Sequence, residues 1–456
     1  MRDIAITLIV FGSLPLILKR PWIGVMVWTW LSIMNPHRMA YGFSQNFPFA
    51  MIVALTTLAA LLVTREQKRI PWEREAIVLL LFVVWMFITT NFAIYTELAW
   101  NQFDKVIKIQ LMTFVAMMLI TTPERVKWFV AVTALSLGFY GVKGGIFTII
   151  NGGAFRVQGP PGTFIDGNNE IGLAMAVAVP LLYFVARDAS SRWLRPALYA
   201  ATVLTAIAAI GTQSRGALVG MAAMGVMFWL KSRQKLLVAI IAGIAVLSVV
   251  QIMPPEWYER MNTINTYQED ASAKGRINAW WMAFNLARSR FMGGGFETFK
   301  PGVFALYAPE PDNVHDVHSI YFEVLGEHGF VGLGLFLLLA LMSWRSASSV
   351  RRAVKGVPQF AWMDDLAAMV QVSFIAYFTA GAFLGLAYFD LYYNIVVVVI
   401  AMKVMLRKHG VMVPKPWAIP TLIHAERSGA ATSGGGAHRL VPASGSLPQT
   451  LRGRLR

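Results

Sequence analysis

The 456-residue sequence contains no cysteine and few charged side chains. The absence of cysteine excludes disulfide bonds and cysteine-ligated metal sites, but it says little about the compartment. Charged residues make up only 14% of the chain, against about 25% in a typical soluble domain. Acids are especially scarce, because 24 Asp and Glu stand against 40 Lys and Arg, which gives a net charge of +16.

Long apolar stretches make up most of the sequence. Hydrophobic residues make up 56% of the chain, and its mean hydropathy is +0.55. Stretches of about 17–25 apolar residues recur, which is the signature of membrane-spanning helices. The pattern predicts an all-α polytopic integral membrane protein with about 12 transmembrane helices. The candidate runs cover residues 4–18, 21–34, 47–63, 76–94, 106–120, 126–150, 171–186, 194–210, 216–230, 236–253, 319–344, 366–389 and 392–405.

The first of these runs is the weakest. Residues 4–18 are short for a span and contain Pro15. We therefore expect a half-span, or a merger with the next run, which leaves twelve spans and both termini on the cytoplasmic side. Residues 1–21 lack the small-residue cleavage pattern of a signal peptide, so we expect no cleaved leader.

Lysine and arginine orient the runs. Basic connections alternate along the chain with connections poorer in these residues, and cytoplasmic connections are the basic ones. The alternation predicts N-terminal transmembrane helices over 1–253, an outward-facing loop over 254–318, C-terminal transmembrane helices over 319–408 and a disordered basic cytoplasmic tail over 409–456. Within the loop, residues 273–290 have the apolar spacing of an amphipathic helix. The basic tail suits anionic membrane lipid, and we expect no nucleic-acid partner.

The outward-facing connections carry arginines that run against this charge bias. Ionisable residues at membrane depth are costly and mark candidate functional sites, and arginine forks match phosphate oxygens. Each has an ordinary alternative, since Arg215 can snorkel to the interface, Arg156 can cap a loop, and Arg276 and Arg288 can lie on a solvated helix face. Converging on one cavity, they would bind a pyrophosphate.

Histidines stand at the start of the run that begins at residue 319. Histidine side chains titrate near neutral pH and suit general-base catalysis. His318, directly before the run, is the stronger candidate base, and His315 is the second. The pair could bind a metal with Asp312, Asp316 or His328, but no HExxH motif or further His/Cys cluster accompanies it, so we predict no metal.

Several short motifs occur in a fixed order. They are RVQGP at 156–160, paired asparagines at 168–169, SRG at 214–216, KGRINAW at 274–280, a glycine run at 293–295 and HSIYFEVLGEHGFVGL at 318–333. In this order and membrane context they resemble the bacterial O-antigen ligase and O-antigen polymerase superfamily, with O-antigen ligases and related O-glycosylation ligases as the most similar members. The resemblance covers roughly residues 1–410.

The resemblance implies a GT-C-like glycosyltransferase of the bacterial inner membrane, with its active site facing the periplasm. It would need neither metal nor cofactor. The implied donor is a glycan on undecaprenyl pyrophosphate, and the implied acceptor is a sugar hydroxyl of lipid A–core oligosaccharide, as in lipopolysaccharide biosynthesis. The family histidine falls on His318 and the family SRG arginine on Arg215. The loop arginines fall less surely on Arg276 and Arg288, and the extra His315 leaves the identity of the base open.

Three other functions fit parts of the same pattern. An O-antigen polymerase would use a second lipid-linked repeat as acceptor, and a protein O-oligosaccharyltransferase would use Ser or Thr. A lipid-linked glycan transporter would catalyse no transfer. Transporters favour broken helices with polar midpoints, whereas the polar candidates here cluster on one side of the membrane, which favours surface chemistry.

Overall fold

The computed structural model describes residues 1–412, apart from residues 67 and 233 and most of residues 238–270. The run predicted at 236–253, the first part of the loop and nearly all of the predicted tail therefore lie outside the described residues. All described residues belong to one compact unit. Within them the regular elements are helices, and no strand occurs.

Most helices in the first half of the chain follow the predicted apolar runs within a few residues, but the helix Thr96–Leu119 begins ten residues before the run predicted at 106–120. The helices of this half are α1 (Arg2–Lys19), α2 (Pro21–Met34), α3 (Phe49–Val63), α4 (Arg74–Asn91), α5 (Thr96–Leu119), α6 (Pro123–Ile150), α7 (Asn168–Asp188), α8 (Leu194–Gly211) and α9 (Arg215–Lys231). Two short 3₁₀ helices, η1 (Pro36–Met39) and η2 (Phe43–Gln45), connect α2 to α3.

The second half contains one loop region and three long helices. The described helices are α12 (Ala271–Ser289), α13 (Pro301–Tyr307), α14 (Ile320–Ala353), α15 (Ala361–Ala380) and α16 (Asp390–Lys408), with η3 (Pro358–Phe360) before α15. Among the described helices five, α4, α6, α7, α8 and α14, are long and apolar enough to cross a membrane, and α2 and α3 are shorter apolar helices. These features are those of a membrane protein.

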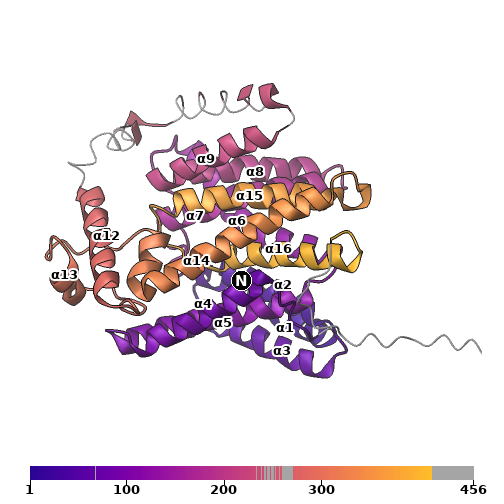
Figure 1. Cartoon of the computed structure of the whole chain (residues 1–456). Helices are drawn as coiled ribbons and strands as arrows, with labels where there is room; N and C mark the ends of the chain where they lie inside the picture. The colour runs from indigo at the N-terminus through magenta and orange to yellow at the C-terminus, as the bar shows by residue number, and fades with distance from the viewer. Residues whose placement is uncertain are drawn as a thin grey trace, which may run out of the picture. The chain divides into compact units, whose positions relative to one another are not determined.

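Helix α7 packs among four other helices. It contacts α6, α8, α9 and α15, and α15 also runs alongside α9 (Figure 1). Most of the side chains on α7 are buried. Helix α12 instead packs against α13 and α14, and it shares with α13 a small apolar core of Ala279, Met282, Leu286, Val303 and Phe304. The loop region thus rests on the first half of α14.

The first helix differs from the expectation. Helix α1 does not merge with α2, because Arg20 has an extended backbone and separates them. It continues through Pro15, and its 18 residues are about 27 Å long at 1.5 Å per residue. Its first turn lies against the connection after α2: Arg2 donates to the carbonyl of Met39 at 2.9 Å, and the hydroxyl of Ser44 donates to Asp3 at 2.6 Å. Met1 therefore faces the same side as residues 36–45, which contradicts the expected placement of the N-terminus on the opposite side from that connection.

A buried ion network joins α4 to α16. Nζ of Lys403 lies 2.8 Å from both carboxylate oxygens of Glu75 and 3.1 Å from Glu73, and Arg407 also pairs with Glu73. The side chains of Lys403, Glu73 and Glu75 are at most 7% exposed. Paired charges tolerate such burial, whereas unpaired ones do not. The network fixes the last helix to the start of the fourth.

Helix α14 bends at Gly329, which the sequence did not predict. The residue has φ 64° and ψ −171°, a conformation that only glycine adopts readily. A Cβ there would lie 2.4 Å from the carbonyl oxygen of Phe291. The glycine run meets the same bend, since N–H groups of Gly294 and Gly295 donate to the carbonyls of Gly326 and Glu327 at 2.8 Å. The run therefore ends α12 and fastens the loop to α14.

Candidate functional site

His318 lies at the entrance to α14 and outside the helix. Its φ is 38°, a left-handed conformation that is uncommon without glycine. Ser319 is the N-cap, so the helix begins at Ile320, whose N–H donates to the carbonyl of Gly381 at 2.8 Å. The indole N–H of Trp280 on α12 donates to the carbonyl of Val317 at 2.9 Å. Contacts on both sides therefore hold the backbone of His318 in place.

The ring of His318 faces two carboxylates. Its Nδ1 lies 3.5 Å from Oε1 of Glu170 and 3.6 Å from Oδ2 of Asp316. Glu170 is the more enclosed partner, with a side chain 17% exposed against 66% for Asp316. Neither contact is a hydrogen bond, but negative charge beside Nδ1 favours the tautomer that carries the proton there and leaves Nε2 free to accept one. The pair can therefore present Nε2 of His318 as a base.

The first turn of α7, which contains Glu170, also contacts the turn that precedes Arg215. The side-chain amide of Asn168 donates to the carbonyl of Thr212 at 2.9 Å. The hydroxyl of Ser214 then accepts from the N–H of Ala217 and caps α9. Arg215 is the first residue of that helix. One rigid set of turns thus links the histidine–carboxylate pair to the arginine.

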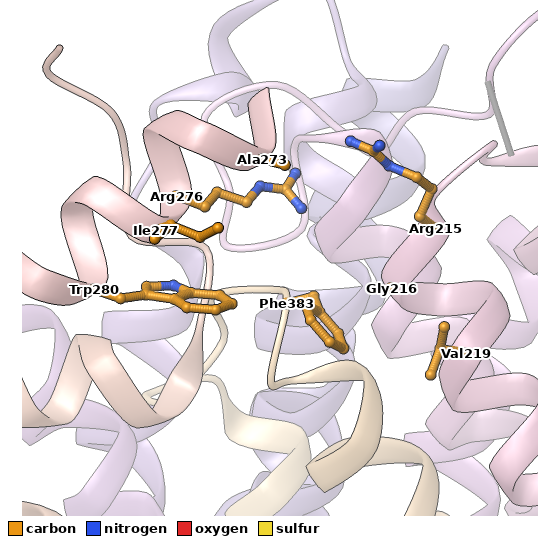
Figure 2. Close-up of a pocket in the computed structure, with 8 residues that line it drawn as sticks. All are labelled: Arg215, Gly216, Val219, Ala273, Arg276, Ile277, Trp280 and Phe383. Atoms are coloured by element: carbon orange, nitrogen blue, oxygen red, sulfur yellow. The ribbon is translucent and has the colours of Figure 1, made fainter. Parts of the chain in front are cut away.

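Arg215 and Arg276 lie on opposite sides of one cavity. Its volume is about 250 Å³, and it is lined by Arg215, Gly216, Val219, Ala273, Arg276, Ile277, Trp280 and Phe383. Figure 2 shows both guanidinium groups at the upper rim and the rings of Trp280 and Phe383 below them. We call this the two-arginine cavity. A site with two positive forks above an apolar base suits a diphosphate attached to a lipid or sugar.

The structure does not bring Arg288 into this cavity. Arg276 and Arg288 are both on α12, but twelve residues of helix separate them by about 18 Å along the axis. Arg288 is exposed, and its guanidinium lies 5.8 Å from the ring centroid of Phe284 on the same helix. Arg288 therefore lies on a solvated helix face and stacks on a neighbouring ring, which was the alternative to substrate binding.

His315 lies against α12, near Arg276. Its ring packs so close to Gly275 that a Cβ on that glycine would be 2.1 Å from Cδ2 of His315. Glycine at this position therefore makes the contact possible. His315 is exposed, and it precedes the helix entrance by three residues more than His318 does. The two histidines are thus held differently, one by α12 and one beside Glu170.

Arg156 lies at a second, larger cavity of about 720 Å³. We call it the basic cavity, because it is lined by Arg2, Arg38, Lys143 and Arg156 together with residues of α1, α6 and the connections 36–45 and 156–161. Nε of Arg156 donates to Oε1 of Gln213 at 3.3 Å, and Gln213 donates to the carbonyl of Gly153 at 2.9 Å. Gln213 stands two residues before Arg215, so this turn links one lining residue of each cavity.

His328 is packed inside the protein. It is fully buried, its Nδ1 lies 2.7 Å from the hydroxyl of Thr89, and its ring centroid is 4.5 Å from that of Phe296. Among the described residues no group of three or more His, Asp or Glu side chains is arranged to bind a metal ion.

Three residues of the site were not predicted from the sequence. Glu170 stands in NNEIG at a helix start, where an acid is usually read as a favourable partner of the helix dipole. Trp280 and Phe383 are aromatic residues in apolar surroundings, which normally indicates core packing. Only the contact with His318 and the shared cavity reveal them. The combination of paired asparagines followed by an acid was the available signal for Glu170.

Comparison with known families divides the chain in two. Residues 1–189 match a model described as a family of unknown function (DUF5935). Residues 200–337 match a model described as O-Antigen ligase. The second match contains Arg215, Arg276 and His318, and it ends within α14. No curated protein matches the chain.

Proposed function

Since the chain belongs to the O-antigen ligase superfamily, we propose that it is a membrane glycosyltransferase of the O-antigen ligase type. It transfers a glycan from undecaprenyl pyrophosphate to a sugar hydroxyl of lipid A–core oligosaccharide, in lipopolysaccharide biosynthesis. The observation that carries the proposal is the joint arrangement of the histidine–carboxylate pair and the two-arginine cavity, which Trp280 connects by lining the cavity and bonding Val317.

The donor supplies the driving force for the transfer. Its sugar–phosphate bond is already activated, so no nucleotide or other cofactor is required. The acceptor hydroxyl oxygen attacks the anomeric carbon while Nε2 of His318 takes the hydroxyl proton. A new glycosidic C–O bond forms, the C–O bond to the pyrophosphate breaks, and its electron pair leaves with undecaprenyl pyrophosphate. Direct displacement from the opposite face inverts the anomeric centre.

Negative charge grows on the pyrophosphate as this bond breaks. Arg215 and Arg276, on the rim of the two-arginine cavity, stabilise that charge with paired hydrogen bonds. Trp280 and Phe383 provide an apolar base for the first part of the lipid chain. Glu170 acts as a positioning residue, because it orients the ring of His318 and stabilises the imidazolium that forms.

The proposal includes a GT-C-like fold in the bacterial inner membrane. Residues 254–318 and the two cavities face the periplasm, and the basic tail over 409–456 is cytoplasmic. Because Met1 shares the side of residues 36–45, the N-terminus is then periplasmic and the number of crossings is odd. Reporter fusions before Met1, at Ser272 and at residue 430 test this arrangement. The first two should report the periplasm, and a cytoplasmic signal from Ser272 would refute the map.

The transfer is tested with purified full-length protein in lipid nanodiscs. The donor is supplied with lipid A–core, with a second lipid-linked repeat or with a Ser/Thr-containing protein, each in a separate reaction. We expect glycan on lipid A–core only, and undiminished transfer after exhaustive EDTA treatment. Transfer to the second repeat would identify a polymerase, and transfer to protein an O-oligosaccharyltransferase. Movement of the donor between leaflets without any transfer would identify a transporter.

A further inference from the structure

The lining of the basic cavity is positively charged and contains no acidic residue. Of its lining residues Arg2, Arg38, Lys143 and Arg156 are basic, and none is acidic. Within the described part of the chain, neither Arg38 nor Lys143 forms an ion pair with a carboxylate. Uncompensated like charges around one hollow repel one another, so an anion bound between them would relieve an electrostatic cost.

The acids nearest in sequence bond to neutral donors, and within the described residues they form no ion pair with the basic residues of the cavity. Asp3 accepts from the backbone N–H and hydroxyl of Ser44, and Asp166 accepts from the N–H of Gly162. Burial, with the charge of Arg38 second, lowers the pKa of His37 to about 4, so this neighbour is neutral at physiological pH. The positive charge of the cavity therefore comes from its lysine and arginine side chains.

Lys143 has an unusual place for a charged residue. It belongs to α6, one of the helices apolar enough to span a membrane, and lies seven residues before its end at Ile150. Seven residues of helix are about 10 Å, so Lys143 enters the cavity below the helix end. A cation at that depth is costly and points to a functional partner.

We propose that the basic cavity binds a phosphate-bearing head group of the acceptor glycolipid. This inference rests on the proposed function and adds a substrate subsite to it. Arg38 and Arg156 supply forks that match phosphate oxygens, and Lys143 supplies a point charge. The volume of about 720 Å³ admits a phosphorylated sugar. Gln213 joins Arg156 to the turn before Arg215, so one turn links this subsite to the two-arginine cavity.

The test is a binding measurement that does not require turnover. Full-length protein in phosphatidylcholine nanodiscs is titrated with lipid A–core glycolipid and with the same glycolipid after enzymatic removal of its phosphates. The variant Arg38→Gln/Lys143→Gln is compared with Lys105→Gln, an exposed lysine of α5 outside the cavity. The double variant should bind the phosphorylated glycolipid at least about 10-fold more weakly, as expected for lost charge-assisted hydrogen bonds. Lys105→Gln should bind it normally.

The phosphate specificity gives the second arm. Dephosphorylation should weaken binding to the wild-type protein by a similar factor and have no further effect on the double variant. Equal affinity of the wild type and double variant for the phosphorylated glycolipid would overturn the proposal. So would full competition by phosphatidylglycerol, which would make the site one for membrane phospholipid.

Failure of this inference can be told apart from failure of the proposed function. If the double variant binds the acceptor normally while the wild type transfers glycan to it, the subsite is wrong and the function stands. If the cavity binds the phosphorylated glycolipid but no glycan is transferred, the function is wrong and the subsite stands. Binding of the lipid-linked donor, measured in parallel, should be the same for wild type and double variant.

Discussion

Nδ1 of His318 lies 3.5 Å from Oε1 of Glu170, although 148 residues separate them in the chain. The contact joins the entrance of α14 to the first turn of α7. Neither residue is part of a regular catalytic sequence motif with the other, so the pairing is a property of the fold. It makes Glu170 the residue whose role is easiest to separate from substrate binding.

Glu170→Gln should lower kcat while leaving KM for both substrates nearly unchanged. The amide keeps the size of the side chain but removes the charge that orients and stabilises the imidazolium. We expect a loss of about 10- to 100-fold, the range seen for residues that position a histidine. The measurement is steady-state transfer by the purified variant. An equal rise in KM would instead indicate that Glu170 contacts a substrate.

His318→Ala should lose more activity than His315→Ala. A general base contributes about 10²- to 10⁴-fold, so single-turnover transfer should fall by that order in His318→Ala. His315 lies against Gly275 and outside the His318–Glu170 pair, and its loss should cost less. Thermal unfolding of both variants controls for folding. Near-normal transfer by His318→Ala together with an inactive His315→Ala would reverse the assignment of the base.

Arg276→Gln and Arg288→Gln form a matched pair on one helix. Both remove one positive charge from α12, but only Arg276 lines the two-arginine cavity. Arg276→Gln should weaken binding of the pyrophosphate-linked donor by about 10- to 100-fold, which corresponds to the loss of a hydrogen bond between charged groups. Arg288→Gln should change donor affinity less than twofold. Equal losses would mean that the helix acts through its overall charge.

Much of the fold could be predicted from the apolar runs, because a membrane leaves only long helices for them. The position of α1 could not, since Pro15 suggests an interruption, whereas the structure continues the helix through it. The sequence alone also could not distinguish Arg276 from Arg288 as candidates for substrate binding. Their sequence spacing gives the position of each along α12, but only the packing of α12 against α14 decides which one reaches Arg215.

The histidine site was predictable in part. The motif around residue 318 identifies the histidine, while its partner depends on a contact between two distant helix entrances. The left-handed backbone of His318 and the bend at Gly329 are likewise set by tertiary contacts with α12 and the glycine run. Local sequence preferences do not favour the left-handed backbone of His318, whereas glycine at position 329 permits the bend without requiring it.

Lys403→Met should destabilise the protein far more than Lys108→Met. Removing the lysine leaves the buried carboxylates of Glu73 and Glu75 without its charge, which costs about 3–5 kcal/mol in comparable cases. The Lys108–Asp104 pair is more than half exposed, and such pairs contribute about 0–1 kcal/mol. Thermal unfolding in detergent checks both variants. Similar melting temperatures would show that the network contributes little.

The same network has a consequence for the synthesis and membrane insertion of the protein. Glu75 and Lys403 are separated by 328 residues, so α4 leaves the ribosome long before α16 exists. During that interval the carboxylates at the start of α4 lack the lysine and arginine that neutralise them in the finished protein, and water is their favourable surroundings. Helix α4 can therefore enter the membrane early, but its ion pairs with Lys403 and Arg407 form only after α16 has been inserted. The helix bundle is therefore complete only after α16 has been translated.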